Sequence, residues 1–404
     1  MKSIRDIYKI GKGPSSSHTM GPERAAKRFL EKYPDADRYC VKLYASLCKT
    51  GRGHGTDRVL YEVLGKARTE VQFCEFSTEP LPHPNTLDFF AYRDREEIGK
   101  MRVMSVGGGD IVIEGEPSAV DEDVYPENSF AEIKQFCAWR YISLHEYVEL
   151  NEGPEIWDYL AEIWRAMKRS VELGLHTEGV LPGGLNVQRK AKQLFDKELE
   201  TELPQVRELR LVCSYAFAVA EENADNGVIV TAPTCGSCGV LPAVLLYMQE
   251  RYDFPDEKVL EALAVAGLIG SLVKRNASVS GAECGCQAEI GTACSMAAAA
   301  LCHLKGLSID QIEYAAEVAM EHQLGLTCDP ICGLVQIPCI ERNAVAAKRA
   351  MDAFNLAYFL CGTRNISFDM VVRTMKETGQ HINASYKETS EGGLAKLYNR
   401  RKFS

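Results

Sequence analysis

A serine- and histidine-rich loop lies near the N-terminus, between two Gly-Pro pairs. The segment GKGPSSSHTMGP covers residues 11–22, just before a helical pattern, and its polar side chains are Ser15, Ser16, Ser17, His18 and Thr19. Hydroxyl groups in such a place can cap a helix, and the backbone amides at a helix start bind anions well. Composition alone favours the helix cap slightly over a substrate-binding loop.

A second loop of the same character follows at residues 50–57, with the sequence TGRGHGTD. It presents three polar residues before another helical pattern: His54, Thr56 and Asp57. A histidine on a glycine-rich loop is a suitable proton carrier, and the alternative is a surface histidine beside a capping aspartate. Two loops that combine hydroxyl groups with histidine in one small domain favour contact with an anion or a substrate.

Cysteine is the other abundant reactive residue, with 15 copies in the chain. This odd count, without a recognisable export signal, argues against a disulfide framework, because cytoplasmic thiols stay reduced. Five cysteines lie in glycine- and proline-rich segments between helical patterns: Cys284, Cys286, Cys328, Cys332 and Cys339. Thiolates on flexible backbone suit an iron–sulfur cluster, and small buried residues are the equally weighted alternative.

Three further patterns give weaker chemical signals. Cys235 and Cys238 form a lone CxxC, so two packed cysteines at a helix start are favoured over a redox or zinc pair. Lys274, with Asn276 beside it, follows a long apolar helical pattern. This lysine could form a Schiff base with pyridoxal phosphate, or it could be a cation favoured at a helix C-terminus. The glycines of SVGGGDIVIEG (105–115) match no nucleotide-binding spacing and predict a tight turn between strands.

The N-terminal part of the chain predicts strands and helices in alternation. Four β-branched or aromatic runs, VKLYASL, VQFCEFS, LDFFAYRD and MRVMSV, predict short strands between residues 38 and 115. Residues 21–33 and 57–69 have helical spacing instead. An acidic segment broken by prolines at 114–129 suits a linker.

Beyond residue 130 nearly every apolar pattern has helical spacing, including 130–151 and the long apolar run at 257–275. The segments between these helices are rich in Gly, Cys, Asn and Pro, and loops of that kind tend to carry function. We therefore expect an α+β multidomain fold. A small α/β domain at 1–130 should precede a mostly α-helical catalytic domain at 131–404.

Length, charge and hydropathy limit the classes of protein to consider. The 404 residues suffice for two or three domains with a core that needs no disulfides. With 46 basic and 56 acidic residues the net charge is −10, which argues against a broad nucleic-acid footprint. No run reaches the roughly 18 uncharged apolar residues of a membrane helix, and no signal peptide is recognisable. We expect a cytoplasmic protein with neither nucleic acid nor a membrane as partner.

Taken together, these segments resemble the iron–sulfur-dependent bacterial L-serine dehydratases, or L-serine ammonia-lyases, in their single-chain form. The resemblance covers nearly the whole chain. Its segments follow one another in the order GPSSSHTMGP, GRGHGTD, HPNT, SVGGGD, LPGGLN, APTCGSCGVLPAV, KRNASVSGAECGCQAEIG, GLTCDPICGLVQIPCIERNA and YKETSEGGLA. The co-occurrence of so many motifs in one order is highly specific, whereas SSSHT alone would not be.

The resemblance implies a 4Fe-4S cluster held by three thiolates of the helical domain. The motif positions place these ligands at Cys286, Cys328 and Cys339, and leave the other loop cysteines without an assignment. Some members dimerise, so a homodimer is the expected assembly. In some single-chain members a C-terminal cysteine also binds the cluster. This chain ends NRRKFS, so we expect no tail ligand.

The implied reaction converts L-serine to pyruvate and ammonia, a step of amino-acid degradation and gluconeogenesis. An iron ion with a free coordination position would act as a Lewis acid on the substrate oxygens. We expect His18 or His54 to handle the α-proton, with Lys274 as a further catalytic residue. The expected substrate-binding residues are Ser15, Ser16, Ser17, Thr19, Thr56, Asp57 and Asn276. The alternatives are a threonine dehydratase, a pyridoxal-phosphate lyase, a zinc hydrolase, and a redox or amino-acid sensor.

Overall fold

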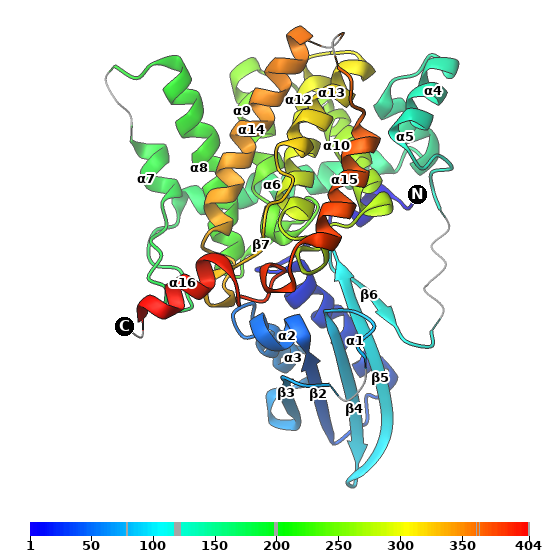
Figure 1. Ribbon diagram of the computed structural model, residues 1–404, viewed down its shortest axis with the longest axis vertical. Coiled ribbons are helices and arrows are strands. Elements are labelled where there is room, and N and C mark those ends of the chain that lie inside the picture. The colour runs from blue at the N-terminus through cyan, green and yellow to red at the C-terminus, as the bar shows by residue number, and fades with distance from the viewer. Residues whose placement is uncertain (78–79, 117–122, 198–200, 361, 363, 403–404) are drawn as a thin grey trace.

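The computed structural model describes residues 1–77, 80–116, 123–197, 201–360, 362 and 364–402. Figure 1 shows a small sheet-containing domain below a larger bundle of helices. Each has its own hydrophobic core of buried side chains. The expected α+β layout, a small α/β domain followed by a helical domain, is therefore confirmed.

The small domain is built on a five-stranded sheet with the order β3-β2-β4-β5-β6. The strands are β2 (Arg38–Tyr44), β3 (Thr69–Cys74), β4 (Thr86–Arg93), β5 (Glu96–Gly107) and β6 (Asp110–Ile113). Only β2 and β3 run parallel among these neighbours, and a parallel pair needs a crossover. The crossover consists of α2 (Ala45–Thr50) and α3 (Thr56–Leu64). All four strands predicted from the sequence are present.

Two helices of the small domain bring its two histidine loops together. α1 (Gly21–Lys32) packs on the sheet through Phe29, whose ring centroid lies 5.1 Å from that of Phe89. α1 also packs beside α3. The SSSHT loop precedes α1 and the GRGHGTD loop precedes α3, so both loops meet at the edge of the small domain that faces the helical domain (Figure 1).

The helical domain surrounds a central helix of small residues. Its helices are α4 (Phe130–Arg140), α5 (Leu144–Glu152), α6 (Ile156–His176), α7 (Ala191–Asp196), α8 (Pro204–Ala224), α9 (Val240–Tyr252), α10 (Asp256–Asn276), α11 (Gly281–Cys284), α12 (Thr292–Leu304), α13 (Ile309–Glu321), α14 (Cys339–Leu360), α15 (Phe368–His381) and α16 (Gly393–Lys402). α12 is buried on nearly all sides, and its run of alanines allows α10, α13 and α14 to pack closely against it.

The first residues of the chain pack with the helical domain rather than with the small sheet. Met1, Ile4, Ile7 and Tyr8 belong to the hydrophobic core of the helices. β1 (Ile10–Lys12) then pairs antiparallel with β7 (Val228–Val230). The SSSHT loop is therefore anchored to the helical domain on one side and to α1 on the other. The expected domain boundary at residue 130 stays a prediction.

Some local expectations changed in detail. The helical pattern at 130–151 forms two helices, because Tyr141 adopts a left-handed φ of 57° between α4 and α5. The glycine run after Ser105 makes the predicted turn between β5 and β6. Within the expected linker at 114–129, residues 117–122 lie outside the described residues, as do the last two residues of the NRRKFS end.

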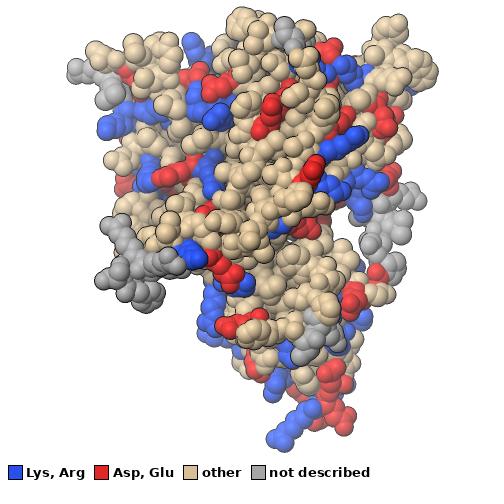
Figure 2. All heavy atoms as spheres, viewed as in Figure 1, with Lys and Arg blue, Asp and Glu red and all other residues tan. Residues whose placement is uncertain are grey.

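Charged side chains of both signs are interspersed over the face shown in Figure 2, as is usual for a solvated surface. In the described part of the chain, no helix is both long enough and apolar enough to cross a membrane. The apolar run at 257–275 forms α10 instead, whose side chains are buried within the bundle from Ala262 to Val273.

Candidate functional site

One pocket is lined by residues of both domains. The two histidine loops contribute Pro14, Ser15 and His54. The helical domain supplies the other lining residues: Gly236, Cys286, Glu289, Ile290, Cys328, Pro330, Val335, Cys339, Arg342 and Glu388. Thiols, carboxyl groups, a guanidinium and an imidazole therefore converge on one concave site.

The three cysteines expected to bind metal come from three separate segments. Cys286 precedes the π-helical turn η5 (Gln287–Gly291), Cys328 lies in the loop after α13, and Cys339 is the first residue of α14. Ligand atoms of Cys286, Cys328 and Glu289 all lie within 4.8 Å of one another. Since Cys339 lines the same pocket, the fold brings all three cysteines together.

The protein environment alone raises the pKa of two of the pocket thiols, those of Cys328 and Cys339. A hydrogen bond with Cys286, together with burial, raises the pKa of the Cys328 thiol well above its ordinary value. Burial, followed by repulsion from Cys286, raises the pKa of the Cys339 thiol. A bound cation reverses this preference, because metals bind the deprotonated thiol. The thiols therefore suit a site that is completed by a positively charged group.

Two glutamates, Glu289 and Glu388, and an arginine complete the pocket, and the sequence analysis did not name them. Burial raises the pKa of both Glu289 and Glu388. Arg342 donates to the carbonyl of Thr327 at 2.7 Å and pairs with Asp329 at 3.6 Å. Glu289, Arg342 and Glu388 lie within the motifs GCQAEIG, QIPCIERN and YKETSEGGLA. The sequence could have pointed to these residues only through their membership of these motifs.

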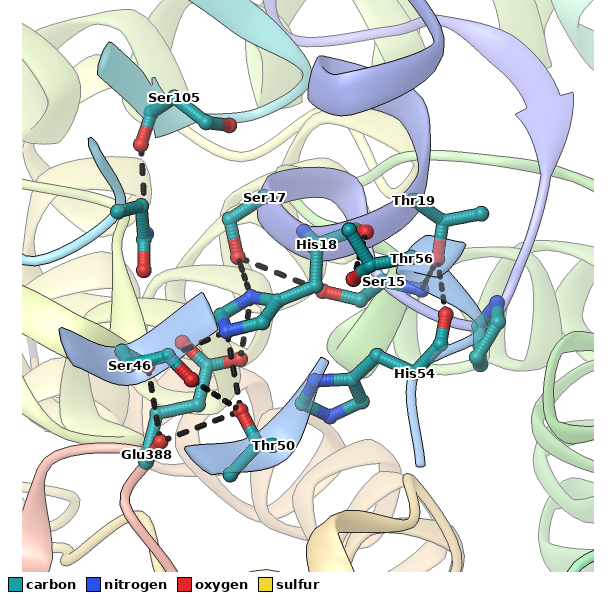
Figure 3. A network of polar contacts seen from close by, with 12 residues as sticks. Ser15, Ser17, His18, Thr19, Ser46, Thr50, His54, Thr56, Ser105 and Glu388 are labelled. Atoms are coloured by element: carbon teal, nitrogen blue, oxygen red, sulfur yellow. Dashed lines mark hydrogen bonds and ion pairs between the residues drawn. The ribbon is translucent and has the colours of Figure 1, made fainter. Parts of the chain in front are cut away.

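His18 lies at the centre of a network of hydroxyl groups (Figure 3). Its Nδ1 lies 2.8 Å from Ser17 Oγ, and its Nε2 lies 3.0 Å from Thr50 Oγ1 and 3.2 Å from Ser46 Oγ. The hydroxyls of Ser46 and Thr50 donate to backbone carbonyls at 2.9 and 3.0 Å, which favours a proton on Nε2 of the ring. Burial, and then the neighbouring His54, hold the pKa of His18 well below its ordinary value.

Glu388 links this network to the cysteine loop. Its Oε1 lies 3.5 Å from Nδ1 of His18, and its carbonyl accepts a hydrogen bond from Ser46 at 2.9 Å. Its amide donates to the carbonyl of Cys328 at 2.9 Å. The other carboxyl oxygen, Oε2, has no hydrogen-bond partner in the described part of the chain. Glu388 therefore holds the histidine network against the loop that carries Cys328.

His54 is the histidine that lines the pocket. Its ring lies edge-on to that of His18, with 4.5 Å between the ring centroids. Burial lowers the pKa of His54 to about 3, so the ring is neutral at physiological pH. Its buried Nδ1 has no hydrogen-bond partner among the described residues. We refer to His18, His54 and Glu388 as the pocket cluster; their ligand atoms lie within 4.8 Å of one another.

Reciprocal hydrogen bonds fix the two histidine loops to each other. Thr19 of the first loop donates to the carbonyl of His54 at 2.7 Å, and Thr56 of the second donates to the carbonyl of His18 at 2.6 Å. Ser15 accepts from the amide of His18 at 3.1 Å and caps the turn. The helix-cap and substrate-loop interpretations are thus compatible, because Ser15 caps a turn and also lines the pocket.

Other expected site residues lie outside the pocket lining. Ser16 is buried within the turn η2 (Ser16–Met20), and Asp57 accepts from the next backbone amide at 3.0 Å. Lys274 pairs with Asp110 at 2.5 Å. Asn276 donates to two backbone carbonyls at 2.8 and 3.0 Å. The fold therefore does not bring these four residues into contact with the cysteine pocket.

Of the four loop cysteines left without an assignment, Cys235, Cys238 and Cys284 are buried and Cys332 is exposed. Cys235 and Cys238 are buried just before α9, as expected for packed residues at a helix start, and Cys235 Sγ lies 3.4 Å from the sulfur of Met20. Cys284 packs against Gly379 of α15. None of these cysteines lines the pocket.

Two family models match the chain. The model described as "Serine dehydratase beta chain" matches residues 3–79, and the model described as "Serine dehydratase alpha chain" matches residues 92–395, more than half of the chain. The chain belongs to the serine dehydratase family. The resemblance inferred from the motifs is thereby confirmed, and both halves of the cysteine pocket lie within family-matched residues.

Serine dehydratases of several bacteria are similar over the whole length. "L-serine dehydratase TdcG" of Escherichia coli is 40% identical, with 98% of this chain and 99% of the relative covered. "L-serine dehydratase" of Streptomyces coelicolor is 41% identical, with 97% and 98% covered. "L-serine dehydratase" of Helicobacter pylori is 38% identical, with 98% of each chain covered. The single-chain arrangement of the two family parts is therefore shared with these relatives.

Proposed function

We propose that this protein is a lyase, an L-serine ammonia-lyase that converts L-serine to pyruvate and ammonia. The observation that carries the proposal is the pocket in which His54 and Ser15 of the small domain face Cys286, Cys328 and Cys339. Membership of the serine dehydratase family, at about 40% identity over nearly the full chain, supports the same reaction.

The proposed cofactor is a 4Fe-4S cluster held by Cys286, Cys328 and Cys339. Three thiols from separate segments, buried at Cys286 and Cys328 and half-buried at Cys339, fit this group, because a cluster needs several thiolates around a bulky inorganic core. Arg342 in the same lining would offset part of the negative charge of the thiolates. When bound, an iron ion with a free coordination position supplies Lewis-acid stabilisation to the substrate oxygens.

Within this proposal His54 removes the α-proton of serine. Its ring is neutral because of burial, and it lines the pocket. Its Nδ1 has no hydrogen-bond partner among the described residues. A positioned imidazole typically contributes about 10²–10⁴-fold to such a proton transfer. The product of β-elimination is aminoacrylate, which loses its nitrogen as ammonia when it tautomerises and hydrolyses to pyruvate.

His18 has a positioning role in the proposed mechanism. Its ring nitrogens are occupied by the hydroxyls of Ser17, Ser46 and Thr50, so it is not free to receive a proton from substrate. Instead its ring packs against His54 and fixes that ring's orientation. Ser15 is the hydroxyl that we assign to substrate binding, because it lies in the lining.

Lys274 and Asn276 are left out of this mechanism. Lys274 bridges to Asp110, where opposite charges hold the pKa of the aspartate at about 2 despite its burial. An ion pair between α10 and β6 suits a residue that fixes one domain on the other. Asn276 similarly donates to the carbonyl of Asn128.

We also propose, from the resemblance alone, a cytoplasmic homodimer that acts in serine degradation and supplies pyruvate to gluconeogenesis.

The experiment that tests the function is an anaerobic assay of pyruvate release with L-serine, D-serine and L-threonine. Iron–sulfur-reconstituted protein should release pyruvate from L-serine, and ketobutyrate release from L-threonine should be slower. Pyridoxal-dependent activity abolished by hydride reduction, or activity that follows zinc rather than iron, would contradict the proposal. Serine binding without pyruvate release would favour a sensor instead.

A further inference from the structure

A second group of two histidines and one glutamate lies outside the pocket, on three helices of the helical domain. His145 is on α5, Glu261 on α10 and His303 at the end of α12. Their ligand atoms all lie within 4.8 Å of one another. We call these three residues the surface cluster. They share no residue with the pocket described above.

The surface cluster is partly open to solvent. The side chains of His303 and Glu261 are 12% and 20% exposed, and His303 Nε2 lies 3.4 Å from Glu261 Oε2. The ring centroids of His145 and His303 lie 4.9 Å apart. An ion can therefore reach these side chains without passing through the core, and water can complete its coordination.

Hydrogen bonding at Ser143 selects the form of His145 that can bind a metal. The Ser143 hydroxyl donates its one proton to Glu146 at 2.7 Å, so it accepts at its contact of 2.9 Å with Nδ1 of His145. The proton of the neutral ring is then on Nδ1, and Nε2 keeps a lone pair. Metal-binding histidines commonly have their other ring nitrogen fixed in this way.

The distances are close to those of a metal centre. A tetrahedral zinc ion with bonds of about 2.0–2.1 Å places its ligand atoms roughly 3.3 Å apart. Glu261 and His303 already have nearly this spacing at 3.4 Å, and the ligand atom of His145 lies within 4.8 Å of both. Lys258 pairs with Glu261 at 2.8 Å, but its side chain is 53% exposed and can turn to solvent.

We propose that His145, Glu261 and His303 bind one divalent transition-metal ion, of the class represented by Zn²⁺, at a site separate from the cysteine pocket. Two imidazoles and one carboxylate form a ligand set that suits zinc better than magnesium or calcium, which prefer oxygen ligands alone. The ion links α5 to α10 and α12 and so fastens the start of the helical domain to its centre.

The test uses the full-length protein with its iron centre loaded under anaerobic conditions. Zn²⁺ is added, loosely bound metal is removed by desalting, and zinc and iron are counted per chain. The wild type should retain about one zinc per chain. His145→Gln, Glu261→Gln and His303→Gln should each lose it, because their affinity for zinc falls at least about tenfold. His322→Gln is the matched control, since His322 is exposed and, among the described residues, contacts the carbonyl of Val318 in the same helix at 2.9 Å.

X-ray absorption at the zinc edge distinguishes this site from the cysteines. The proposal predicts a zinc shell of nitrogen and oxygen only, at about 2.0–2.2 Å. Sulfur neighbours at about 2.3 Å, equal zinc retention by all variants, or no zinc retained by the wild type would each overturn it. Circular dichroism of the variants in the absence of zinc separates loss of the site from loss of the fold.

Discussion

The pocket cluster and the surface cluster have the same composition, but the first is buried and the second is only partly buried. Each has one glutamate and two histidines. The angle between the two ring planes is 69° in the pocket cluster and 66° in the surface cluster. In the pocket cluster His18 is fully buried and the Glu388 side chain is 8% exposed. In the surface cluster the His303 and Glu261 side chains are 12% and 20% exposed.

This comparison shows that residue types alone do not decide what a cluster does. In the pocket, hydroxyl groups occupy both nitrogens of the His18 ring. The Nδ1 of His54 has no hydrogen-bond partner among the described residues, and His54 lines the same pocket as three cysteines. At the surface, a hydroxyl fixes Nδ1 of His145 and leaves Nε2 with a lone pair, and the ligand atoms of the three residues lie within 4.8 Å of one another. The first arrangement suits proton transfer, and the second suits metal binding.

The largest difference between the two regions should appear when a pocket cysteine is replaced. Cys328→Ser removes one of three proposed cluster ligands, so iron content and pyruvate release should both fall to background. Zinc retention at the surface cluster should be unchanged. Cys213→Ser, on α8 outside the pocket, is the control and should keep its iron. Full activity in the Cys328 variant would refute the ligand assignment.

The next largest effect is expected from the pocket histidine. His54→Gln removes the proposed base and should lower kcat by about 10²–10⁴-fold while iron content stays normal. The corresponding His303→Gln change should alter zinc retention rather than kcat. Near-normal turnover of an iron-loaded His54 variant would show that another group removes the proton.

A smaller effect should follow from loosening His18. Thr50→Val removes a hydroxyl that contacts Nε2 of His18. The loss of one hydrogen bond costs about 0.5–1.5 kcal/mol, so kcat should fall roughly two- to tenfold. Thr374→Val is a matched control, since Thr374 also donates to a carbonyl four residues earlier but lies on the exposed face of α15. The pH profile of the Thr50 variant should shift, whereas a purely structural role would leave it unchanged.

The smallest effect concerns stability in acid. The pKa of His54 is about 3 in the folded chain and about 6.5 when unfolded, so the unfolded state binds the proton first. Stability from this group is therefore present above pH 6.5 and is lost as the pH falls toward 3. When the pH is lowered from 7 to 5.5, the free energy of unfolding measured in urea should fall by about 1 kcal/mol less in His54→Gln than in the wild type. An equal loss in both would contradict the burial of a neutral ring.

Local patterns predicted the elements that hold the site. Short runs of β-branched and aromatic residues identified β2 to β5, and helical spacing identified most helices, because both patterns depend on near neighbours in the chain. α8 was not predicted, although its second half is buried. The pairing of β1 with β7 could not be predicted either, because each strand has three residues and the partners are more than 200 residues apart.

The sequence identified the loops of the site better than the roles within them. The two histidine loops and the cysteines were found as motifs, and the structure brings His54 and all three cysteines into one lining. Glu388 was missed, because its contacts with His18 and Cys328 join segments that are far apart in the chain. Lys274 was named as catalytic from its position after a helix, but its nearest partner, Asp110, depends on the docking of the two domains.

The central claim is that histidines of the small domain and cysteines of the helical domain form one active site for serine. The most direct measurement is the anaerobic rate of pyruvate release from L-serine per iron–sulfur cluster, for the wild type, His54→Gln and Cys328→Ser. The account predicts a high rate in the wild type, a cluster-loaded but nearly inactive His54 variant, and a cluster-free, inactive Cys328 variant. A fully loaded wild type that releases no pyruvate, or a cluster-free chain that does, would contradict it.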